Sequence, residues 1–391
     1  MTQAPVHPAN WKKVHVVDVC ETVSVGIVIQ PSQYYVDAGE GIRAFRSANV
    51  GENRIVDRDW VYLSPEGHRA NSKSSLQAGD VLVVRSGAPG TACVVTEQYA
   101  GTNCIDVVFA RPRQDQVLSE YLAEFTNSPV GRRHVLGMQG GLALKHFNVG
   151  AYKKLALLLP AVTEQKRIVD VLAAWDTAIQ KTEQLIAAKE RHFAATSHLL
   201  LTSRKRLNSF SGRWGFRRAD EIFANTSRKG HINEPLLSVT QERGVIPRDM
   251  LDGRVTMPSG ETGAFKLVEP GNFVISLRSF QGGLEHSNYC GLVSPAYTVL
   301  KEMVEIDERF FRHYFKSADF IKRLSVAVIG IRDGKQISFQ DFCSIKLPFP
   351  AVDEQKAIAA FLDDAEGEIT LLSKYTVALK TQKRGLMQKL L

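Results

Sequence analysis

The sequence predicts a mixed α/β protein, in which two α/β domains alternate with two long helices. Three observations predict this fold class. A stretch of 42 residues occurs twice, 190 positions apart, so the chain contains a duplicated structural unit. Within each copy the apolar residues recur at alternating steps of four and three, as in the seam of a coiled coil. Before each copy, short β-rich runs alternate with turn-forming clusters and one amphipathic helical pattern.

The repeated stretch begins like a helix in both copies. The first opens with PAVTEQKRI at 160–168 and the second with PAVDEQKAI at 350–358, and 12 of the 42 aligned positions are identical. Thr163 and Asp353 are predicted to cap the helices, because a side-chain oxygen at a helix start can accept from the free amides of the first turn. A glutamate follows each of them, where the positive end of the helix dipole favours an anion.

Each helix is predicted to bury one apolar seam. Four polar positions interrupt the 3.5-residue repeat, namely Thr182, Lys189, Thr376 and Lys383. A helix of about 38 residues is roughly 57 Å long, which is longer than most globular helices. The predicted seam residues are Ile168, Leu172, Trp175, Ile179, Ile186, Ile358, Leu362, Ile369, Leu372 and Leu379.

The connections predict how the helices pair. The linker 207–212 after the first helix is short, so the second helix can cover its seam only by running back along the first. We therefore expect an antiparallel pair with one domain at each end and an approximate two-fold axis. The expected segments are a first domain (1–159), a first coiled-coil helix (160–206), a second domain (207–349) and a second coiled-coil helix (350–391).

The two domains are predicted to share one plan. Gly271 and Asn272 precede an apolar run, as Gly79 and Asp80 precede the run 81–84. An amphipathic helix is predicted at 118–135, with Tyr121, Leu122 and Phe125 facing inward. The aromatic residues Phe310, Phe311, Tyr314 and Phe315 mark its counterpart.

Composition fits an ordinary globular protein. The chain has 391 residues, of which 44% are hydrophobic and 23% charged, so it can bury sizeable cores and is not disordered. No run approaches the ~18 apolar residues of a membrane span. Five cysteines without a C-x-x-C pair argue against zinc and a disulfide framework, and a reducing cytoplasm is expected. The net charge of +8 permits nucleic-acid binding without demonstrating it.

The twice-occurring helix start resembles that of the specificity subunits of type I restriction-modification systems. In that family the motif usually runs L-P-x-P-x-x-E-Q-x-x-I and ends a variable target-recognition domain. The segments LP at 159–160 and LPFP at 347–350 fit, whereas the first copy lacks the earlier proline. The resemblance extends from Trp11 to Leu391 in order and spacing.

The resemblance implies a non-catalytic subunit that reads double-stranded DNA. Each target-recognition domain would read one half of a split site, and the helices would act as a ruler and as a docking surface for two adenine methyltransferase (M) subunits. Those subunits would carry S-adenosylmethionine, while a separate restriction (R) subunit would cut unmodified DNA. Two linked readers gain affinity because the second contact is intramolecular, and their separation must match whole turns of the duplex.

No catalytic motif was found in the sequence. There is no G-x-x-x-x-G-K-[ST] loop, since GIRDGKQ at 330–336 is one residue too short, and no G-x-G-x-x-G or N-P-P-Y stretch. Glu164 with Lys166, and Glu354 with Lys356, superficially offer the Glu-x-Lys of a nuclease, but helix initiation explains them better. We expect no catalytic residue, metal or cofactor in this chain, although a triad assembled in space is invisible to sequence.

Several polar residues are candidates for DNA contact. Two arginine–serine pairs each end an apolar run, where an arginine can fork onto guanine or hold a phosphate; a surface salt bridge is the competing interpretation. Glycine-containing loops just before each long helix supply the others, for which a solvated loop is the alternative. The candidates are Arg85, Ser86, Lys145, His146, Arg278, Ser279, Arg332, Lys335 and Gln336.

Two other functions remain open at this point. The chain is a stand-alone DNA-binding scaffold, or orphan specificity protein, if it co-purifies with no methyltransferase. It is an enzyme with a spatially assembled site if the lone chain turns over DNA with a divalent metal. An adjacent adenine methyltransferase gene would favour the specificity subunit.

Overall fold

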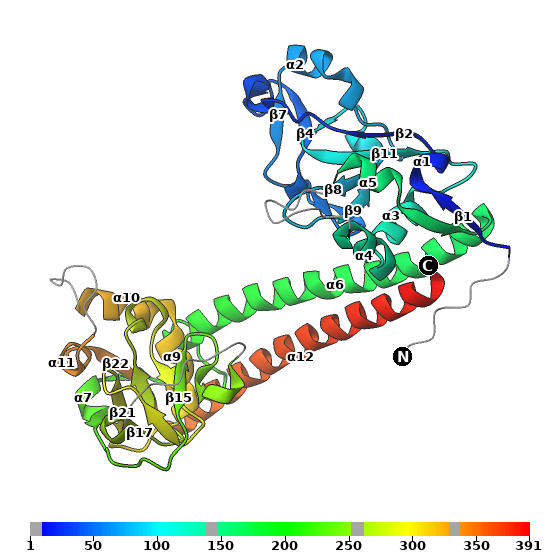
Figure 1. Cartoon of the computed structure of the whole chain (residues 1–391). Helices are drawn as coiled ribbons and strands as arrows, with labels where there is room; N and C mark the ends of the chain where they lie inside the picture. Colours follow the sequence, from blue (N-terminus) through cyan, green and yellow to red (C-terminus); the bar gives the residue numbers. More distant parts are fainter. Residues whose placement is uncertain (1–9, 138–147, 252–261, 328–336) are drawn as a thin grey trace. The chain divides into compact units, whose positions relative to one another are not determined.

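The computed structural model describes residues 10–137, 148–251, 262–327 and 337–391. It divides into two compact units: unit 1 combines residues 1–184 with 373–391, and unit 2 is formed by residues 185–372. Each unit contains one α/β domain together with parts of both long helices (Figure 1). In the described part of the chain, no helix combines the length and the apolar character that crossing a bilayer requires.

The two long helices are α6 (Val162–Leu201, 40 residues) and α12 (Val352–Leu390, 39 residues), so the predicted length of about 38 residues is confirmed. The predicted caps are wrong, because both helices begin one residue before them. The carbonyl of Ala161 accepts from the amide of Gln165 at 2.9 Å, and that of Ala351 from Gln355 at 3.0 Å. An alanine therefore takes the cap position, and a downstream glutamine side chain holds each helix start instead.

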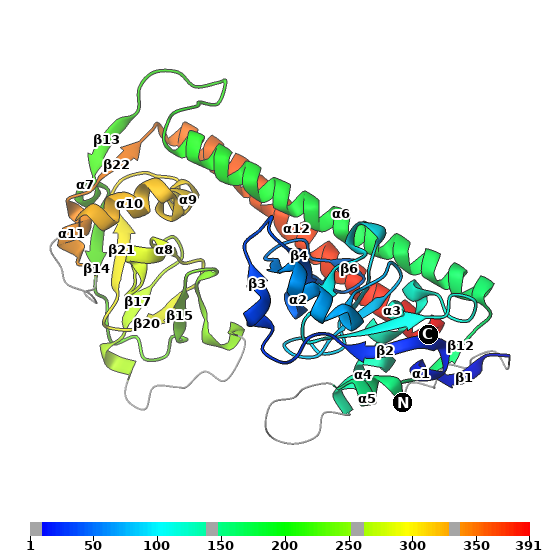
Figure 2. The same cartoon turned by 90° about the horizontal axis from the view of Figure 1, so that it is seen from above.

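The domain of unit 1 is built on two four-stranded sheets and two strand pairs (Figure 2). The central sheet has the order β2 (Cys20–Val25), β11 (Val107–Pro112), β8 (Val81–Val84), β9 (Ala92–Val94). The second sheet has the order β10 (Asn103–Cys104), β4 (Ile42–Phe45), β7 (Val61–Leu63), β3 (Tyr35–Val36). The pairs are β1 (Lys12–His15) with β12 (Ala156–Leu159), and β5 (Val50–Gly51) with β6 (Arg54–Ile55).

The helices of this domain are α1 (Val16–Val19), α2 (Pro65–Ala70), α3 (Ser119–Asn127), α4 (Pro129–Gly137) and α5 (Val149–Lys153). The single helix predicted at 118–135 is thus two helices. The break falls at Ser128, because Pro129 disfavours helical backbone in the residue before it and the Ser128 hydroxyl turns back to the carbonyl of Phe125 at 2.6 Å.

Strand β8 is buried on both faces. Val81 and Val83 pack in the cluster that contains α3 and the start of α6, whereas Leu82 and Val84 pack in a second cluster with Phe45 and Phe109. Alternate residues of a strand point to opposite faces, so the continuous apolar run is explained by a sheet covered on each side. Met387 and Leu391 of the C-terminal stretch complete the first cluster.

Among the described residues, the domain of unit 2 repeats the central sheet of unit 1, but it has three strand pairs where unit 1 has a second four-stranded sheet and two pairs. Its central sheet has the order β14 (Phe223–Thr226), β21 (Thr298–Glu302), β18 (Phe273–Ile275), β19 (Glu285–His286). The strand pairs are β13 (Gly215–Arg218) with β22 (Lys346–Phe349), β15 (Leu237–Thr240) with β16 (Gly244–Pro247), and β17 (Lys266–Val268) with β20 (Gly291–Val293). The helices are α7 (Ala219–Ile222), α8 (Ser279–Gly282), α9 (Glu308–Lys316), α10 (Ala318–Ala327) and α11 (Phe339–Cys343).

The predicted aromatic helix is α9, whose residues build an aromatic core. Phe223 of β14 meets Phe311 edge to face at 5.3 Å, and Phe273 of β18 meets Phe315 at 4.9 Å. Such pairs are worth about 0.5–1.5 kcal/mol beyond their buried area. The sheet and α9 are therefore held together mainly by aromatic rings, whereas the corresponding cluster of unit 1 is mostly aliphatic, with Tyr121, Phe125 and Tyr152 as its buried aromatic residues.

Within each unit the long helices run antiparallel, as expected. In unit 1 Lys383 pairs with Asp176 at 2.7 Å and Lys380 pairs with Glu183 at 2.7 Å. Residue numbers therefore decrease along α12 in the direction in which they increase along α6. In unit 2 Lys189 pairs with Glu368 at 2.8 Å. Among the predicted seam residues, those buried are Ile168, Leu172, Ile179, Ile358, Leu362 and Leu379, and those half-buried are Trp175, Ile186, Ile369 and Leu372.

A buried glutamine ties each domain to its long helix. In unit 1 the Gln165 amide nitrogen donates to the carbonyl of Pro160 at 3.0 Å, and its oxygen accepts from the amide of Leu118, the residue before α3, at 2.9 Å. In unit 2 Gln355 donates to Pro350 at 2.9 Å and accepts from Asp307, the cap of α9, at 2.9 Å. Both glutamines are 0% exposed.

We expect Gln165→Leu and Gln355→Leu each to lower the free energy of unfolding by about 1–3 kcal/mol, because each leaves a buried backbone amide without its acceptor. Urea unfolding of the full chain measures the loss. Gln180→Leu, at an exposed position of α6, is the control and should change stability by less than about 0.5 kcal/mol. Equal stability of all three variants would contradict this role.

Candidate nucleic-acid interface and domain–helix junctions

The first arginine–serine pair lies at the end of β8, facing an aspartate. The Arg85 guanidinium donates to Asp106, whose backbone is in the left-handed region at φ 50°. Ser86 donates to the same carboxylate at 3.5 Å. Arg85 is mostly buried, with 19% of its side chain exposed, so the geometry at this position favours the salt-bridge interpretation.

The second pair lies at the start of α8, and its two members differ. Ser279 is buried and accepts from the amide of Ser276 at 2.8 Å, so its hydroxyl is committed to the turn. Arg278 is exposed, and its carbonyl accepts from the side chain of Gln241 at 3.3 Å. The guanidinium has no ion-pair partner among the described residues. Of the four described candidates, Arg278 is the one presented to solvent with its charge unneutralised.

The other five candidates lie outside the described residues: Lys145, His146, Arg332, Lys335 and Gln336.

The junction of domain and helices in unit 1 is a buried ionic cluster. Lys383 of α12 is 7% exposed and donates to Glu124 of α3 at 3.2 Å and to Asp176 of α6 at 2.7 Å. Burial raises the pKa of Glu124 to about 7, although Lys383 opposes the rise. One lysine between two carboxylates thus links a domain helix with both long helices.

The tip of the β5–β6 hairpin joins this cluster. Asn53, with φ at 51°, donates to Asp176 at 3.1 Å and accepts from Asn127 of α3 at 2.7 Å. Arg54 donates to Glu183 at 3.1 Å, and Glu52 accepts from Arg132 at 2.9 Å. The hairpin tip is therefore fixed between the domain and α6.

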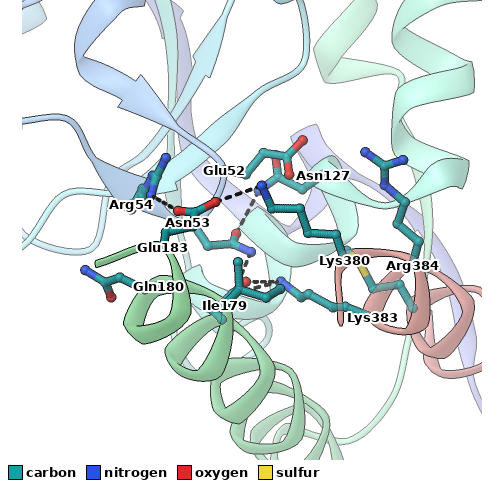
Figure 3. Close-up of a pocket in the computed structure, with 12 residues that line it drawn as sticks. Glu52, Asn53, Arg54, Asn127, Ile179, Gln180, Glu183, Lys380, Lys383 and Arg384 are labelled. Atoms are coloured by element: carbon teal, nitrogen blue, oxygen red, sulfur yellow. Dashed lines mark hydrogen bonds and ion pairs between the residues drawn. The ribbon is translucent and has the colours of Figure 1, made fainter. Parts of the chain in front are cut away.

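A cavity of about 260 Å³ lies beside this hairpin, lined by residues of the domain, α6 and α12 (Figure 3). In the figure the side chains of Arg54 and Lys380 converge on Glu183. Partial burial opposes ionisation of Glu183, but the two cations outweigh it and its pKa is lowered. Ion pairs already satisfy most of the charges around the cavity.

The corresponding junction of unit 2 uses an arginine. Arg312 of α9 donates to Asp363 and to Glu366 of α12, both at 2.7 Å, and His313 lies 2.8 Å from Asp363. Burial and the neighbouring guanidinium lower the pKa of His313, whereas His313 and Arg312 outweigh burial and lower the pKa of Asp363.

The ring of His313 and the carboxylates of Asp363 and Glu366 offer ligand atoms within 4.8 Å of one another, a spacing that suits a metal ion. The guanidinium of Arg312 already contacts all three groups, at 2.7, 2.7 and 3.0 Å. It therefore supplies the positive charge that a metal would bring, and the donor set fits an arginine-centred network better than a metal centre.

A second cavity, of about 300 Å³, lies in unit 2 between the β15–β16 turn, β19, α9 and parts of both long helices. Glu285 accepts from Lys316 at 2.5 Å. Burial lowers the pKa of the neighbouring His286 to about 4, with Glu308 opposing and Arg312 adding to the shift. His286 is thus a neutral ring at physiological pH.

The junction residues were not predicted as a site. Gln165 and Gln355 stand in the repeated motif, and their identity in both copies was the available signal, because a glutamine is not needed to start a helix. Lys383 carried a signal of a different kind. It occupies a position of the apolar seam, where a side chain is expected to be buried. A buried lysine needs a carboxylate partner, so its position implied one.

We expect Lys383→Met to lower the free energy of unfolding by about 3 kcal/mol at pH 8, because it leaves the buried carboxylate of Glu124 without its cation. Urea unfolding of the full chain measures the change. Lys380→Met removes an ion pair that is half exposed and should cost less than about 1 kcal/mol. An equal loss of unfolding free energy in the two variants would contradict the assignment of Lys383 as the buried cation of this junction.

We expect His286 to make the chain less stable as the pH falls. Its folded pKa lies below the ordinary value of 6.5, so between pH 6.5 and 4 the unfolded state takes up a proton that the folded ring does not. The loss from pH 7 to pH 5 should be about 2 kcal/mol. Urea unfolding at both pH values measures this loss, and His286→Leu should remove it. A variant whose stability depends on pH as that of the wild type does would refute the role of His286.

Comparison with known proteins identifies the architecture. No protein-family model matches the chain. Three solved structures match almost its whole length at 14–16% identity. The HsdS subunit from Thermoanaerobacter tengcongensis has 16% identity and a TM-score of 0.50, with 100% of this chain and 99% of that chain covered.

The S subunit of a type I restriction-modification system from M. genitalium has 14% identity and a TM-score of 0.55, with 99% of each chain covered. A chain from a structure described as showing complex assembly and conformational transition of the type I R-M system has 15% identity and a TM-score of 0.60, with 98% of each chain covered. This chain has the fold of the HsdS specificity subunits of type I restriction-modification systems.

Proposed function

We propose that this chain is the DNA-specificity subunit of a type I restriction-modification complex. In this proposal the segments 1–159 and 207–349 are target-recognition domains, each of which reads one half of a bipartite site in double-stranded DNA. The segments 160–206 and 350–391 are the helices on which methyltransferase subunits dock. The chain itself is non-catalytic, and S-adenosylmethionine is bound by its partners.

The observation that carries the proposal is the duplicated plan. Two domains whose central sheets have the same strand order are each tied by a buried glutamine to the start of a long helix, and the whole chain has the specificity-subunit fold. Two similar domains on one chain suit a split target, because linked contacts reinforce one another. The net charge of +8 favours a polyanionic partner.

Exposed apolar residues on the long helices support partner docking. Large apolar side chains that face solvent are sites of protein contact when they gather on one element. The exposed ones on α6 and α12 are Val171, Leu185, Leu199, Phe361, Leu371, Tyr375 and Val377.

The direct test is co-expression with an adenine methyltransferase subunit from the same host. We expect a stable complex that methylates adenine at a two-part sequence with a fixed spacer, read out by methylation-sensitive sequencing. Sequence-specific binding by the chain alone, with no methyltransferase recovered, would favour the stand-alone scaffold. DNA turnover by the lone chain with a divalent metal would overturn the non-catalytic assignment.

We expect Arg278→Ala to weaken specific DNA binding about 5- to 100-fold, with the effect confined to the half-site read by the second domain, because a bidentate arginine–guanine contact is worth about 1–3 kcal/mol. Titration of the complex with matched and half-site-scrambled duplexes measures it. Arg218→Ala in the same domain, whose guanidinium is held by Asp220 at 2.9 Å, should leave binding unchanged. A loss that is equal for all sequences would make Arg278 a phosphate contact.

A further inference from the structure

In each domain the most exposed large apolar side chain is an isoleucine in an equivalent loop. Among the described residues of the first domain Ile29 has the largest exposed fraction, 77%, and among those of the second domain Ile232 has it, 63%. Ile29 lies in the loop after β2 and Ile232 in the loop after β14, and these two strands hold the same place in the two central sheets. Both domains therefore present the same residue type from corresponding parts of the fold.

The residues that follow each isoleucine are also alike. An exposed amide residue comes next, Gln30 in the first domain and Asn233 in the second. A proline then follows at Pro31 and at Pro235. Asparagine and glutamine side chains are among those that hydrogen-bond to base edges, so each loop combines an exposed apolar group with a polar group suited to nucleic acid.

The loop of unit 1 is held close to Ile29. Two residues earlier, Ile27 is 7% exposed; its amide donates to the carbonyl of Cys104 at 2.9 Å, and its carbonyl accepts from the amide of Asp106 at 3.0 Å. Two residues later, the ring of Pro31 fixes the backbone φ. Isoleucine is branched at Cβ and therefore stiff at χ1, so this exposed side chain is largely ordered before it meets any partner.

The loop of unit 2 is held in a different way. The amide of Glu234 donates to the carbonyl of His231 at 3.1 Å, so Ile232 is a central residue of a closed four-residue turn. The carbonyl of Pro235 accepts from the amide of Leu292 in β20 at 2.8 Å, which ties the end of the turn to the domain. A side chain presented on such a turn loses little conformational entropy on binding.

Each loop leaves its sheet at the end that carries the arginine–serine pair. Strands β2 and β8 both pair antiparallel with β11, and β14 and β18 both pair antiparallel with β21. The two strands in each set are thus parallel to each other, and their chains leave the sheet at the same end. The Ile29 loop therefore shares an end with Arg85, and the Ile232 loop shares one with the unneutralised Arg278. In unit 1 Asp106 contacts both the loop and Arg85.

These surroundings suit DNA better than a protein partner. A stable protein interface buries roughly 800 Å² on each side, whereas Ile29 has one exposed apolar neighbour, Val28, and Ile232 stands between His231 and Asn233. In DNA-binding proteins a single apolar side chain is enough, because one wedge between two base pairs unstacks the step and kinks the duplex.

We propose that Ile29 and Ile232 are wedges that insert between neighbouring base pairs, one in each half of the target. This inference rests on the proposed function, under which the two domains bind DNA. Pyrimidine–purine steps unstack most easily, so each half-site is expected to contain such a step at the point of insertion. The isoleucines then contribute to specificity through the deformability of the DNA, without a hydrogen bond to a base.

The test uses the complex with the methyltransferase and its bipartite target, with 2-aminopurine placed in turn at half-site positions other than the methylated adenine. Fluorescence of this base rises when it is unstacked, so the wild type should give a rise at one step in each half-site. Ile29→Ala should abolish the rise in one half-site and Ile232→Ala in the other. Each should weaken specific binding about tenfold, as expected when a buried isoleucine is truncated, whereas Ile29→Leu and Ile232→Leu should retain both signals.

Val17→Ala and Met303→Ala are the matched controls. Val17 in α1 is 45% exposed and precedes β2, while Met303 is 53% exposed and follows β21, so both lie toward the opposite ends of the sheets. These controls should bind DNA as the wild type does. All the variants change exposed side chains and should keep the midpoint of thermal unfolding within about 2 °C.

The outcomes separate the two proposals. If the alanine variants keep wild-type affinity and fluorescence, or if the wild type unstacks no base outside the methylated adenine, the wedges are wrong and the proposed function stands. If the wild-type complex recognises no bipartite sequence, the proposed function fails, and the role of the two isoleucines fails with it.

Discussion

The buried side-chain amide at the start of each long helix is the contact on which the arrangement of each unit depends. The side-chain nitrogen of Gln165 and of Gln355 donates to the proline carbonyl just before the long helix. The side-chain oxygen accepts from the backbone amide at the start of the domain helix. An amide buried in an apolar junction is costly unless both ends are satisfied. This requirement fixes the start of each long helix against its domain in one register.

Around this common contact the two junctions have diverged in chemistry. Glu124 and His313 each stand six residues after the residue that the glutamine holds. Glu124 meets a lysine from α12, whereas His313 lies against Asp363 with its ring 6.2 Å from that of Phe193. Each junction balances its buried charges with its own set of partners. The two domains therefore attach to their long helices through the same glutamine contact, although the charged residues around that contact differ.

Periodicity and repetition sufficed to predict the fold class, both long helices and their antiparallel pairing, because these depend on patterns that span many residues. The prediction failed where one local contact decides. Pro129 divides the predicted helix at 118–135, and an alanine caps each long helix because Gln165 and Gln355 hold the start. Lys383 was counted as an interruption of the seam, although it is buried by carboxylates that lie far away in sequence. For Arg85 the decisive partner, Asp106, lies 21 residues away, beyond the reach of local pattern.

The sharing of both long helices between the units sets the order in which the chain can mature. Unit 1 contains residues 1–184 but also 373–391, so Met387 and Lys383 reach it only after residues 185–372 have been translated. At about 5–20 residues per second, translating residues 185–372 takes roughly 10–40 s. During that interval the apolar cluster of unit 1 lacks Met387 and Leu391, so this cluster is completed only after all residues of unit 2 have been made.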